Sequence, residues 1–367
     1  MQSSSHSESS MRIFALTFLP LVACIDDTGE GKDAPPEQSA LGAVDGSSEV
    51  EWTYIIGEEE RLTDPRDLGF DAEGNLWIAN REDDRTFIVS NPGTPEQDHE
   101  RRKDAAANHF MEETAALSFD DDSQFGSCGE TRNTYDDAAS PNDFMGPVLW
   151  SADLEVFAEQ NPEGLGSHLD MLHQSPYCVG IAWERDNVYW AFDGKNDNIV
   201  RYDFASDHGI GQDDHANGIV DRLTEFEVAR VEGAPSHMMV DPESGILYVA
   251  DTGNGRVLWI DTATGESGDA LRARNEPLAE YTEWVDVDWG VLVEGLDEPG
   301  GLALDGEYLY VAEYATGILH AFTKDGEAVS ELDSGRGGTA IYGIEIGPDG
   351  ALWVVDNSEP AVYRLEP

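Results

Sequence analysis

The stretch that decides the fold is residues 247–260, LYVADTGNGRVLWI, because the chain repeats its pattern. An apolar and aromatic run ends in an acid, a polar loop follows, and a second apolar run starts near an arginine. Such runs between Gly- and Asp-rich turns are typical of antiparallel strands. Further copies begin at Leu76, Tyr189, Leu309 and Leu352.

A short apolar strand and a turn precede each copy, so each repeat has the composition of one propeller blade. The long gap between the copies at Leu76 and Tyr189 holds a degenerate copy, with strands expected at 117–119, 125–128, 148–150 and 154–157. The sequence therefore predicts an all-β, six-bladed β-propeller with four-stranded antiparallel blades.

The last repeat reaches the C-terminus after only three strands. Residues 50–56, which precede the first blade, are strand-like. We expect this N-terminal segment to supply the missing outer strand and close the ring, which removes exposed sheet edges.

The N-terminus has the features of an export signal. Residues 11–24, MRIFALTFLPLVAC, combine a basic residue with an apolar stretch too short to span a bilayer. The ending resembles the lipobox of bacterial lipoproteins, which implies a lipidated mature start at Cys24; an ordinary signal peptide with an accidental cysteine is the alternative. We expect a signal peptide over 1–24, a disordered acidic tether over 25–49 and the propeller over 50–367. The protein would then be extracytoplasmic, anchored by lipid to the bacterial cell envelope.

The charge balance excludes some partners. The chain has 75 acidic and 21 basic residues, a formal net charge of −54. Phosphate groups repel such a surface, so we expect no nucleic acid partner and membrane contact only through the lipid anchor. Screening salt or bound cations would relieve the self-repulsion.

Two cysteines remain after Cys24, and in an exported protein a remaining pair favours a disulfide. The repeat register places Cys128 on the inner strand of the second blade and Cys178 at the start of the third. Two buried free thiols are the alternative.

Two stretches resemble known propeller families. Residues 249–257, VADTGNGRV, resemble the signature of NHL repeats, and residues 180–183 and 201–203 are similar to the SMP-30/gluconolactonase group. The resemblance covers most of residues 50–367 and implies the fold. It implies no activity, because propellers host many functions.

The ligand sets of two enzyme families with this architecture do not carry over. Where peptidylglycine amidating lyases have a zinc-ligating histidine, this chain has Ser236, with His237 one residue later. The gluconolactonase pattern requires asparagines that the matching blade starts lack. The other positions matched to the lyase ligands are Arg66, Val179, Gly300 and Tyr342.

Histidines recur in the loops that lead into three adjacent blades. Imidazole with carboxylate is the ligand chemistry of zinc and other transition metals, so we expect a metal site at the mouth of the central channel. Hydrogen-bonded loop caps are the alternative. The candidate ligands are His109, Glu112, His168, His173 and His237, and the candidate catalytic residues near them are Arg66, Arg132 and Tyr342.

A second group of oxygen donors lies in residues 207–218, DHGIGQDDHANG. Because this loop follows the third strand of its blade, we expect it on the opposite face. Clustered Asp residues with glycines suit calcium, here through Asp207, Asp213 and Asp214, although the spacing is not that of an EF-hand. A solvated acidic loop is the alternative.

These observations leave the function open between classes. The leading hypothesis is a surface lipoprotein whose propeller face binds a small molecule, glycan or protein. The alternative is a metal-dependent lyase or hydrolase acting at the channel mouth, so whether the protein is an enzyme stays undecided. A purely structural envelope component is a third hypothesis.

Overall fold

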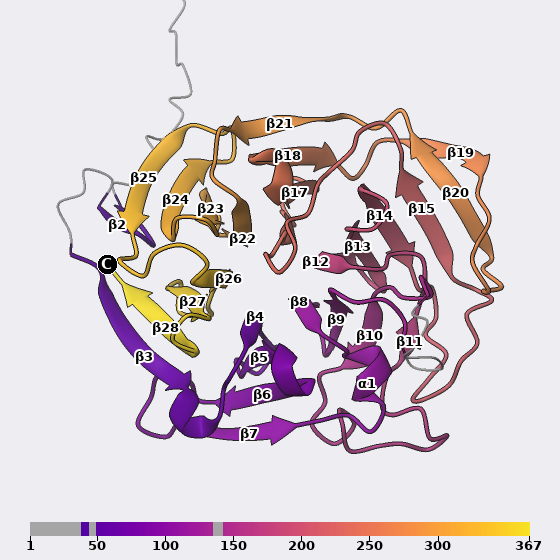
Figure 1. The fold of residues 1–367 in the computed structure, drawn as a ribbon, viewed down its shortest axis with the longest axis horizontal. Helices are drawn as coiled ribbons and strands as arrows, with labels where there is room; N and C mark the ends of the chain where they lie inside the picture. Colours follow the sequence, from indigo (N-terminus) through magenta and orange to yellow (C-terminus); the bar gives the residue numbers. More distant parts are fainter. Residues whose placement is uncertain (1–37, 44–48, 135–141) are drawn as a thin grey trace, which may run out of the picture. The chain divides into compact units, whose positions relative to one another are not determined.

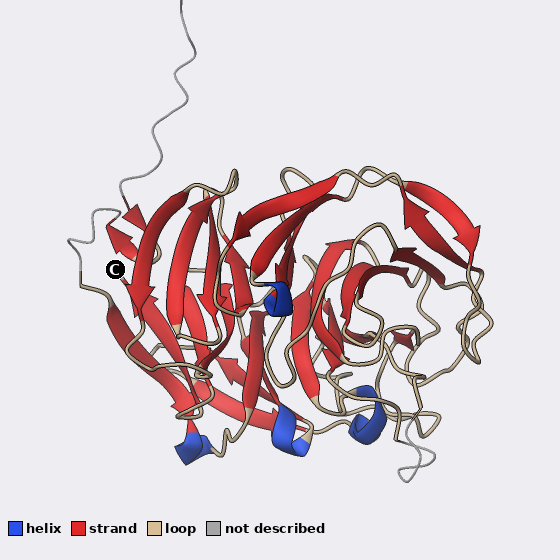
Figure 2. Ribbon diagram, turned by 45° about the horizontal axis from the view of Figure 1, so that its top comes forward, coloured by secondary structure: helices blue, strands red, loops and turns tan. Residues whose placement is uncertain are grey.

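A computed structural model of the protein describes residues 38–43, 49–134 and 142–367. In this part of the chain six sheets, each with a four-stranded antiparallel core, stand in a ring around a central channel, which makes a six-bladed β-propeller (Figure 1). Helices are confined to single short turns (Figure 2). None of the described helices is long and apolar enough to cross a membrane. The expected signal peptide and most of the expected tether lie outside the described residues.

Each blade runs outward from the channel in chain order, except that the outer strand of blade 6 comes from the N-terminal segment. Blade 1 contains β4 (Pro65–Phe70), β5 (Leu76–Asn80), β6 (Arg85–Ser90) and β7 (Asp98–Arg102); blade 2 contains β8 (Thr114–Phe119), β9 (Gln124–Gly129), β10 (Val148–Ser151) and β11 (Asp170–Met171); blade 3 contains β12 (Cys178–Arg185), β13 (Val188–Asp193), β14 (Asn198–Asp203) and β15 (Ile219–Leu223). Blade 4 contains β16 (Met238–Val240), β17 (Ile246–Asp251), β18 (Arg256–Asp261) and β21 (Trp289–Glu294); blade 5 contains β22 (Pro299–Leu304), β23 (Tyr308–Glu313), β24 (Ile318–Thr323) and β25 (Ala328–Asp333); blade 6 contains β26 (Ile341–Ile346), β27 (Leu352–Asp356), β28 (Ala361–Glu366) and β3 (Glu51–Gly57).

The ring is closed by the N-terminal strand, as the sequence predicts. β3 pairs antiparallel with β28, with Tyr54 opposite Tyr363. The closure joins the two ends of the propeller and leaves no blade three-stranded.

Blade 3 has an unexpected extension. The hairpin β19 (Glu266–Ala270) and β20 (Glu280–Val285) is inserted before the outer strand of blade 4. β20 pairs in parallel with β15, so blade 3 becomes a six-stranded sheet, β12-β13-β14-β15-β20-β19. Figure 1 shows this hairpin at the outer edge of the ring.

The blades pack through large apolar side chains. Trp77 of blade 1 is fully buried, with ring centroids 5.3 Å from Phe125 and 5.1 Å from Phe157. Gly126 allows blades 2 and 3 to approach closely, since a Cβ there would lie 2.7 Å from Cδ1 of Ile181. Burial of this kind contributes about 25 cal/mol per Å² of apolar surface and holds the ring together.

In every blade except blade 2, a polar residue at the end of the second strand has a structural role. Its side-chain oxygen accepts hydrogen bonds from backbone N–H groups. For Asp193 and Asp356 the donors lie in the loop that follows the strand, and for the other three residues they lie in the loop that leads into the blade. The full set is Asn80, Asp193, Asp251, Glu313 and Asp356.

The disulfide between Cys128 and Cys178 is confirmed, with Cα atoms 5.5 Å apart. It joins blades 2 and 3, but Cys128 lies on β9, the second strand of its blade, and not on the inner strand. The inner strand β8 begins earlier than expected, at Thr114.

Two further expectations about segments are wrong. Residues 154–157 form turns, and the outer strand of blade 2 is β11, because residues 152–169 form a long excursion before the chain returns to pair with β10. Within the expected tether, β1 (Gln38–Ser39) and β2 (Gly42–Ala43) form a small hairpin. Its buried Ala40 donates a backbone hydrogen bond to the Tyr310 hydroxyl, 3.0 Å away.

Candidate metal centre

Histidines and carboxylates gather at the outer rim of blades 2 and 3. They come from the outermost strand β11, from the segment that follows it, from the connection between β14 and β15, and from the connection between β19 and β20. In Figure 1 these elements lie at the periphery of the ring, and not around the channel. The expected location at the channel mouth is therefore wrong for this cluster, because the long connections carry its histidines outward.

The first group of potential ligands is His173, His215 and Glu276. One carboxylate oxygen, Oε1 of Glu276, lies 2.9 Å from Nδ1 of His173 and 2.9 Å from Nδ1 of His215. The side chain of Glu276 is wholly buried. Two imidazoles and a carboxylate form a donor set that binds zinc and other transition metals.

The second group is Asp170, His208 and His215, so it shares His215 with the first. In each group the potential ligand atoms lie within 4.8 Å of one another. Among the described residues, Oδ2 of Asp170 and Nε2 of His208 are buried without a hydrogen-bond partner. Buried polar atoms are normally satisfied, so this pair marks a place where a cation would supply the missing interaction.

Burial controls the charges of the cluster. It raises the pKa of Asp170 to about 7, so this carboxyl gives up its proton only near neutral pH. Burial also acts to raise the pKa of Glu276, but hydrogen bonds from His173 and His215 outweigh it and lower that pKa to about 2. Burial opposes a charge on His215, yet its hydrogen bond with Glu276 raises the pKa of that imidazole. The cluster thus holds one fixed anion and one carboxyl that a cation would ionise.

A cavity of about 160 Å³ lies against the cluster. His109, at α1 (Ala107–Phe110), and His168 line it together with His173 and His215. Burial lowers the pKa of His109 to about 4 and that of His168 to about 3, so both imidazoles are neutral at pH 7. Aromatic rings stack on two of the histidines, with ring centroids 3.8 Å apart for Phe110 and His168 and 3.6 Å apart for Phe144 and His173.

Two of the five predicted transition-metal ligands lie elsewhere. Glu112 accepts a hydrogen bond from the Thr134 hydroxyl at 2.6 Å. His237 lies among the inner strands, where Nε2 donates to the backbone oxygen of Ala115 at 3.2 Å and Nδ1 is 3.5 Å from Asp67. The structure brings together His109, His168 and His173, and it separates them from His237 because that residue directly precedes the inner strand β16.

The acidic loop expected on the opposite face is part of this same rim. Its His208 and His215 join the cluster, and the backbone N–H of Gly211 donates to the backbone oxygen of His168 at 2.8 Å. The three candidate calcium ligands do not form a group among the described residues. Asp207 and Asp214 accept hydrogen bonds from their own turns, and Asp213 lines the 160 Å³ cavity.

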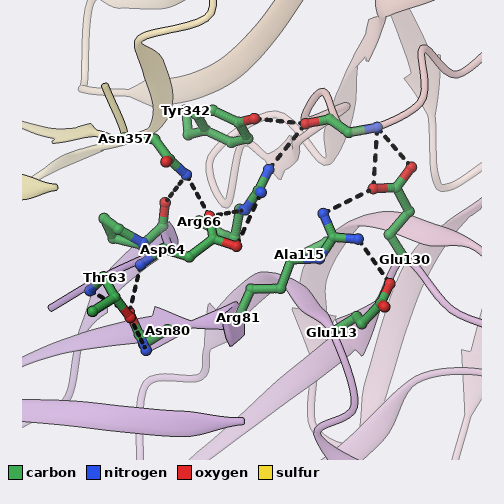
Figure 3. Close-up of polar contacts among 12 residues, drawn as sticks. Thr63, Asp64, Arg66, Asn80, Arg81, Glu113, Ala115, Glu130, Tyr342 and Asn357 are labelled. Atoms are coloured by element: carbon green, nitrogen blue, oxygen red, sulfur yellow. Dashed lines mark hydrogen bonds and ion pairs between the residues drawn. The ribbon is translucent and has the colours of Figure 1, made fainter. Parts of the chain in front are cut away.

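The channel mouth is covered by the connection between β15 and β16. The backbone oxygen of Gly233 accepts hydrogen bonds from Arg66 at 3.0 Å and from the Tyr342 hydroxyl at 2.7 Å (Figure 3). The Arg66 guanidinium also stacks over the Tyr342 ring, 4.4 Å from its centroid. Arg132, the third candidate catalytic residue, is not part of this group, and its Nε pairs with Asp143 at 2.6 Å.

Ion pairs complete the cover. The backbone N–H of Gly233 donates to Glu130 at 2.9 Å, and Glu130 also pairs with Arg230 and lies 3.7 Å from Arg81. Arg81 makes a second ion pair with Glu113 at 2.7 Å (Figure 3). The charged groups of the mouth are thus engaged with one another and with the loop, so Arg66 and Tyr342 hold a backbone segment in place.

Asp170 was not among the predicted ligands, and sequence reasoning also missed the contribution of three further residues. His208 and His215 were visible as two histidines in one acidic loop, but the repeat register assigned that loop to the other face. Glu276 carried no signal, because it lies in a polar connection 103 residues from His173 in sequence.

No protein-family model matches the sequence, and no curated protein matches it. Solved structures do resemble the fold. An auxiliary nutrient binding protein from Bacteroides thetaiotaomicron is 11% identical with a TM-score of 0.51, over 87% of this chain and 76% of that chain. A protein of the same description from Bacteroides ovatus is 10% identical with a TM-score of 0.51, over 86% and 73%. Virginiamycin B lyase from Staphylococcus aureus is 12% identical with a TM-score of 0.49, over 87% and 100%.

At these identities the likeness shows the fold alone. The fold defines the class of the protein as a β-propeller.

Proposed function

We propose that the protein is an extracytoplasmic lipoprotein that binds a divalent transition metal at the rim of blades 2 and 3 and a ligand or partner through its propeller surface. The observation that carries the metal site is the buried convergence of His173, His208, His215, Asp170 and Glu276. The propeller class supports the binding role, since the auxiliary nutrient binding proteins have this fold. Membership of the NHL or SMP-30-like families belongs to the same proposal.

The metal would cross-link segments that are far apart in the sequence. Residues 204–218 and 271–279 are long connections without strands, and each provides a potential ligand next to β11. A metal with ligands from all of them would stabilise the rim, as structural zinc sites do. In an acidic chain of this charge, a bound cation also reduces self-repulsion.

The test is zinc binding by the full chain, purified without a metal-binding tag and treated with a chelator. Calorimetric titration should give about one zinc per chain. His215→Ala should abolish the binding, because His215 belongs to both ligand groups. His99→Ala is the matched control, since His99 is exposed on β7 and should leave binding unchanged. Equal zinc binding by wild type and His215→Ala would overturn the metal site.

A metal-dependent lyase or hydrolase is the second candidate, and the 160 Å³ cavity against His173 and His215 favours it. A catalytic metal keeps one coordination position open, whereas a structural metal is fully ligated by protein. Cobalt(II) in place of zinc reports the difference. A change in its visible spectrum on adding azide would support an open coordination position. An unchanged spectrum would argue against a catalytic metal and leave ligand binding as the only proposed function.

Lipid anchoring has a separate test. Full-length protein expressed in a bacterium that processes lipoproteins should partition into the detergent phase, and Cys24→Ser should move it to the aqueous phase. Aqueous partitioning of the wild type would contradict the anchor without affecting the metal site.

A further inference from the structure

A cavity of about 360 Å³ lies next to the candidate metal centre and is lined by three arginines and one carboxylate, Asp143. Arg222 comes from β15, while Arg272 and Arg274 come from the connection between β19 and β20. The chain has 17 arginines in all, so this one cavity takes an unusual share of its basic residues.

Arg222 forms a fixed wall of the cavity. Its guanidinium donates to Asp193 at 2.7 Å, to the backbone oxygen of Gln174 at 2.6 Å and to the Tyr281 hydroxyl at 2.8 Å. These bonds engage each of its nitrogens and hold it in place, so it contributes shape, while the buried carboxylate of Asp193 balances its charge.

Arg272 and Arg274 are not engaged in the same way. Arg274 lies 3.8 Å from Asp143, beyond hydrogen-bond distance, and its side chain is 51% exposed. No ion pair or side-chain hydrogen bond recorded among the described residues involves Arg272. In the same part of the chain, Arg61 also lacks a recorded carboxylate partner, but it lies on the open surface, whereas Arg272 lines a cavity.

Amide groups face the same cavity. Asn198 accepts a hydrogen bond from Arg222 through Oδ1, and Asn196 donates through Nδ2 to Asp193. The second polar atom of each amide, Nδ2 of Asn198 and Oδ1 of Asn196, makes no hydrogen bond recorded in the described part of the chain. The cavity therefore offers one donor and one acceptor besides the two guanidinium groups.

We propose that this cavity binds a small organic anion, whose oxyanion group is held by Arg272 and Arg274 and whose polar body contacts the Asn196 and Asn198 amides. Guanidinium groups bind carboxylates and phosphates through paired, charge-assisted hydrogen bonds. The volume is in the range of small-molecule sites. Selective uptake of an anion by a protein of net charge −54 requires such a local concentration of arginines.

The experiment is calorimetric titration of the full chain at constant ionic strength with two oxyanion probes, L-malate and inorganic phosphate. Malamide, the neutral analogue of malate, is the control ligand. Malate or phosphate should bind while malamide does not. Binding of malate alone identifies a carboxylate ligand, and binding of phosphate alone identifies a phosphate ester. Binding of neither probe, or equal binding of malamide, overturns the proposal.

Variants locate the site. Arg272→Ala and Arg274→Ala should each weaken binding by about tenfold, the usual effect of losing a charge-assisted hydrogen bond. Arg272→Lys should weaken it less, because the charge remains. Arg61→Ala is the matched control, since Arg61 is an exposed arginine after η1 (Glu58–Glu60), outside the cavity. An effect of Arg61→Ala equal to that of Arg272→Ala would show general charge screening and overturn the site.

Discussion

The channel mouth and the rim of blades 2 and 3 use the same residue types in opposite ways. At the mouth, Arg66, Arg81 and Arg230 are engaged by carboxylates or by the backbone of Gly233. At the rim, Asp170 and His208 each have a buried polar atom without a hydrogen-bond partner in the described structure. Nε of Arg66 at the mouth also lacks a hydrogen bond among the described residues, but the carboxylate of Asp64 lies 2.8 Å from it. Satisfied polar networks hold a structure together, whereas unsatisfied buried groups mark places where a ligand has a role.

The two regions also differ in origin. The mouth is built from residues at the ends of repeat strands and from the connection between β15 and β16, which links two consecutive blades. The rim is built from a long excursion before β11, the connection between β14 and β15, and the inserted hairpin β19–β20. The repeat thus provides a scaffold, and the insertions carry the candidate chemistry, as is common when loops are positioned by a rigid frame.

The largest effect on stability should come from the disulfide, which links blades 2 and 3. Replacing Cys128 and Cys178 by serine in a Cys24→Ser background should lower the free energy of unfolding by about 4 kcal/mol, because the bond closes a loop of 50 residues. Urea titration of the variant against its Cys24→Ser parent measures this. Identical midpoints would mean that the bond does not constrain the chain.

Removing the ion pairs of the channel mouth should lower the free energy of unfolding by less than loss of the disulfide does, and it should leave the rim intact. Glu130→Gln leaves Arg81 and Arg230 without their shared carboxylate, but both arginine side chains are about a fifth exposed. We expect a loss of about 2 kcal/mol, below the 3–5 kcal/mol of a fully buried pair.

Thermal unfolding measures that loss, and zinc affinity should be unchanged. Glu359→Gln, at an 82% exposed carboxylate, is the control and should have little effect on stability. Lost zinc binding in Glu130→Gln would contradict the independence of the two regions.

Acid should weaken metal binding at the rim. The pKa of Asp170 is about 7, so below pH 7 a metal must displace its proton, and the affinity should fall about tenfold per pH unit from this group alone. Above pH 7 the carboxyl is already ionised, and the dependence should flatten. Zinc titrations between pH 5.5 and 8.5 measure the slope.

Asp170→Asn tests the assignment of that slope. The variant should bind zinc more weakly at pH 8 and should lose the part of the slope that belongs to Asp170. A slope unchanged by the substitution would assign the proton to another group.

The smallest expected effect is a coupling between the two rim sites. The Gln174 amide donates to Glu276 at 2.9 Å and accepts from the backbone N–H of Arg274 at 3.3 Å, so the candidate metal centre and the arginine cavity share a wall. A metal bound to Glu276 should restrict the motion of Gln174 and Arg274 and so strengthen malate binding by about threefold. This coupling between metal and malate binding is small by the usual scale. Weaker malate binding in the zinc-loaded protein would show that the metal draws the arginines away.

Local pattern was enough to predict the blades. The strand that starts at Leu247 and its copies follow from alternation, aromatic content and turn residues, which act over a few residues. The closing strand β3 and the disulfide followed from counting strands and cysteines. The outer strand of blade 2 was missed because β11 has only two residues and follows a long irregular segment.

The sequence by itself determined the propeller, since each blade is a meander of neighbouring strands whose pairing is encoded within one repeat. Only the tertiary structure decided where the candidate site lies. Glu276 meets His173 across 103 residues, and His208 meets Asp170 through a loop that the repeat does not describe. Such long-range contacts depend on how the inserted segments pack against the folded propeller, and no local sequence pattern encodes that packing.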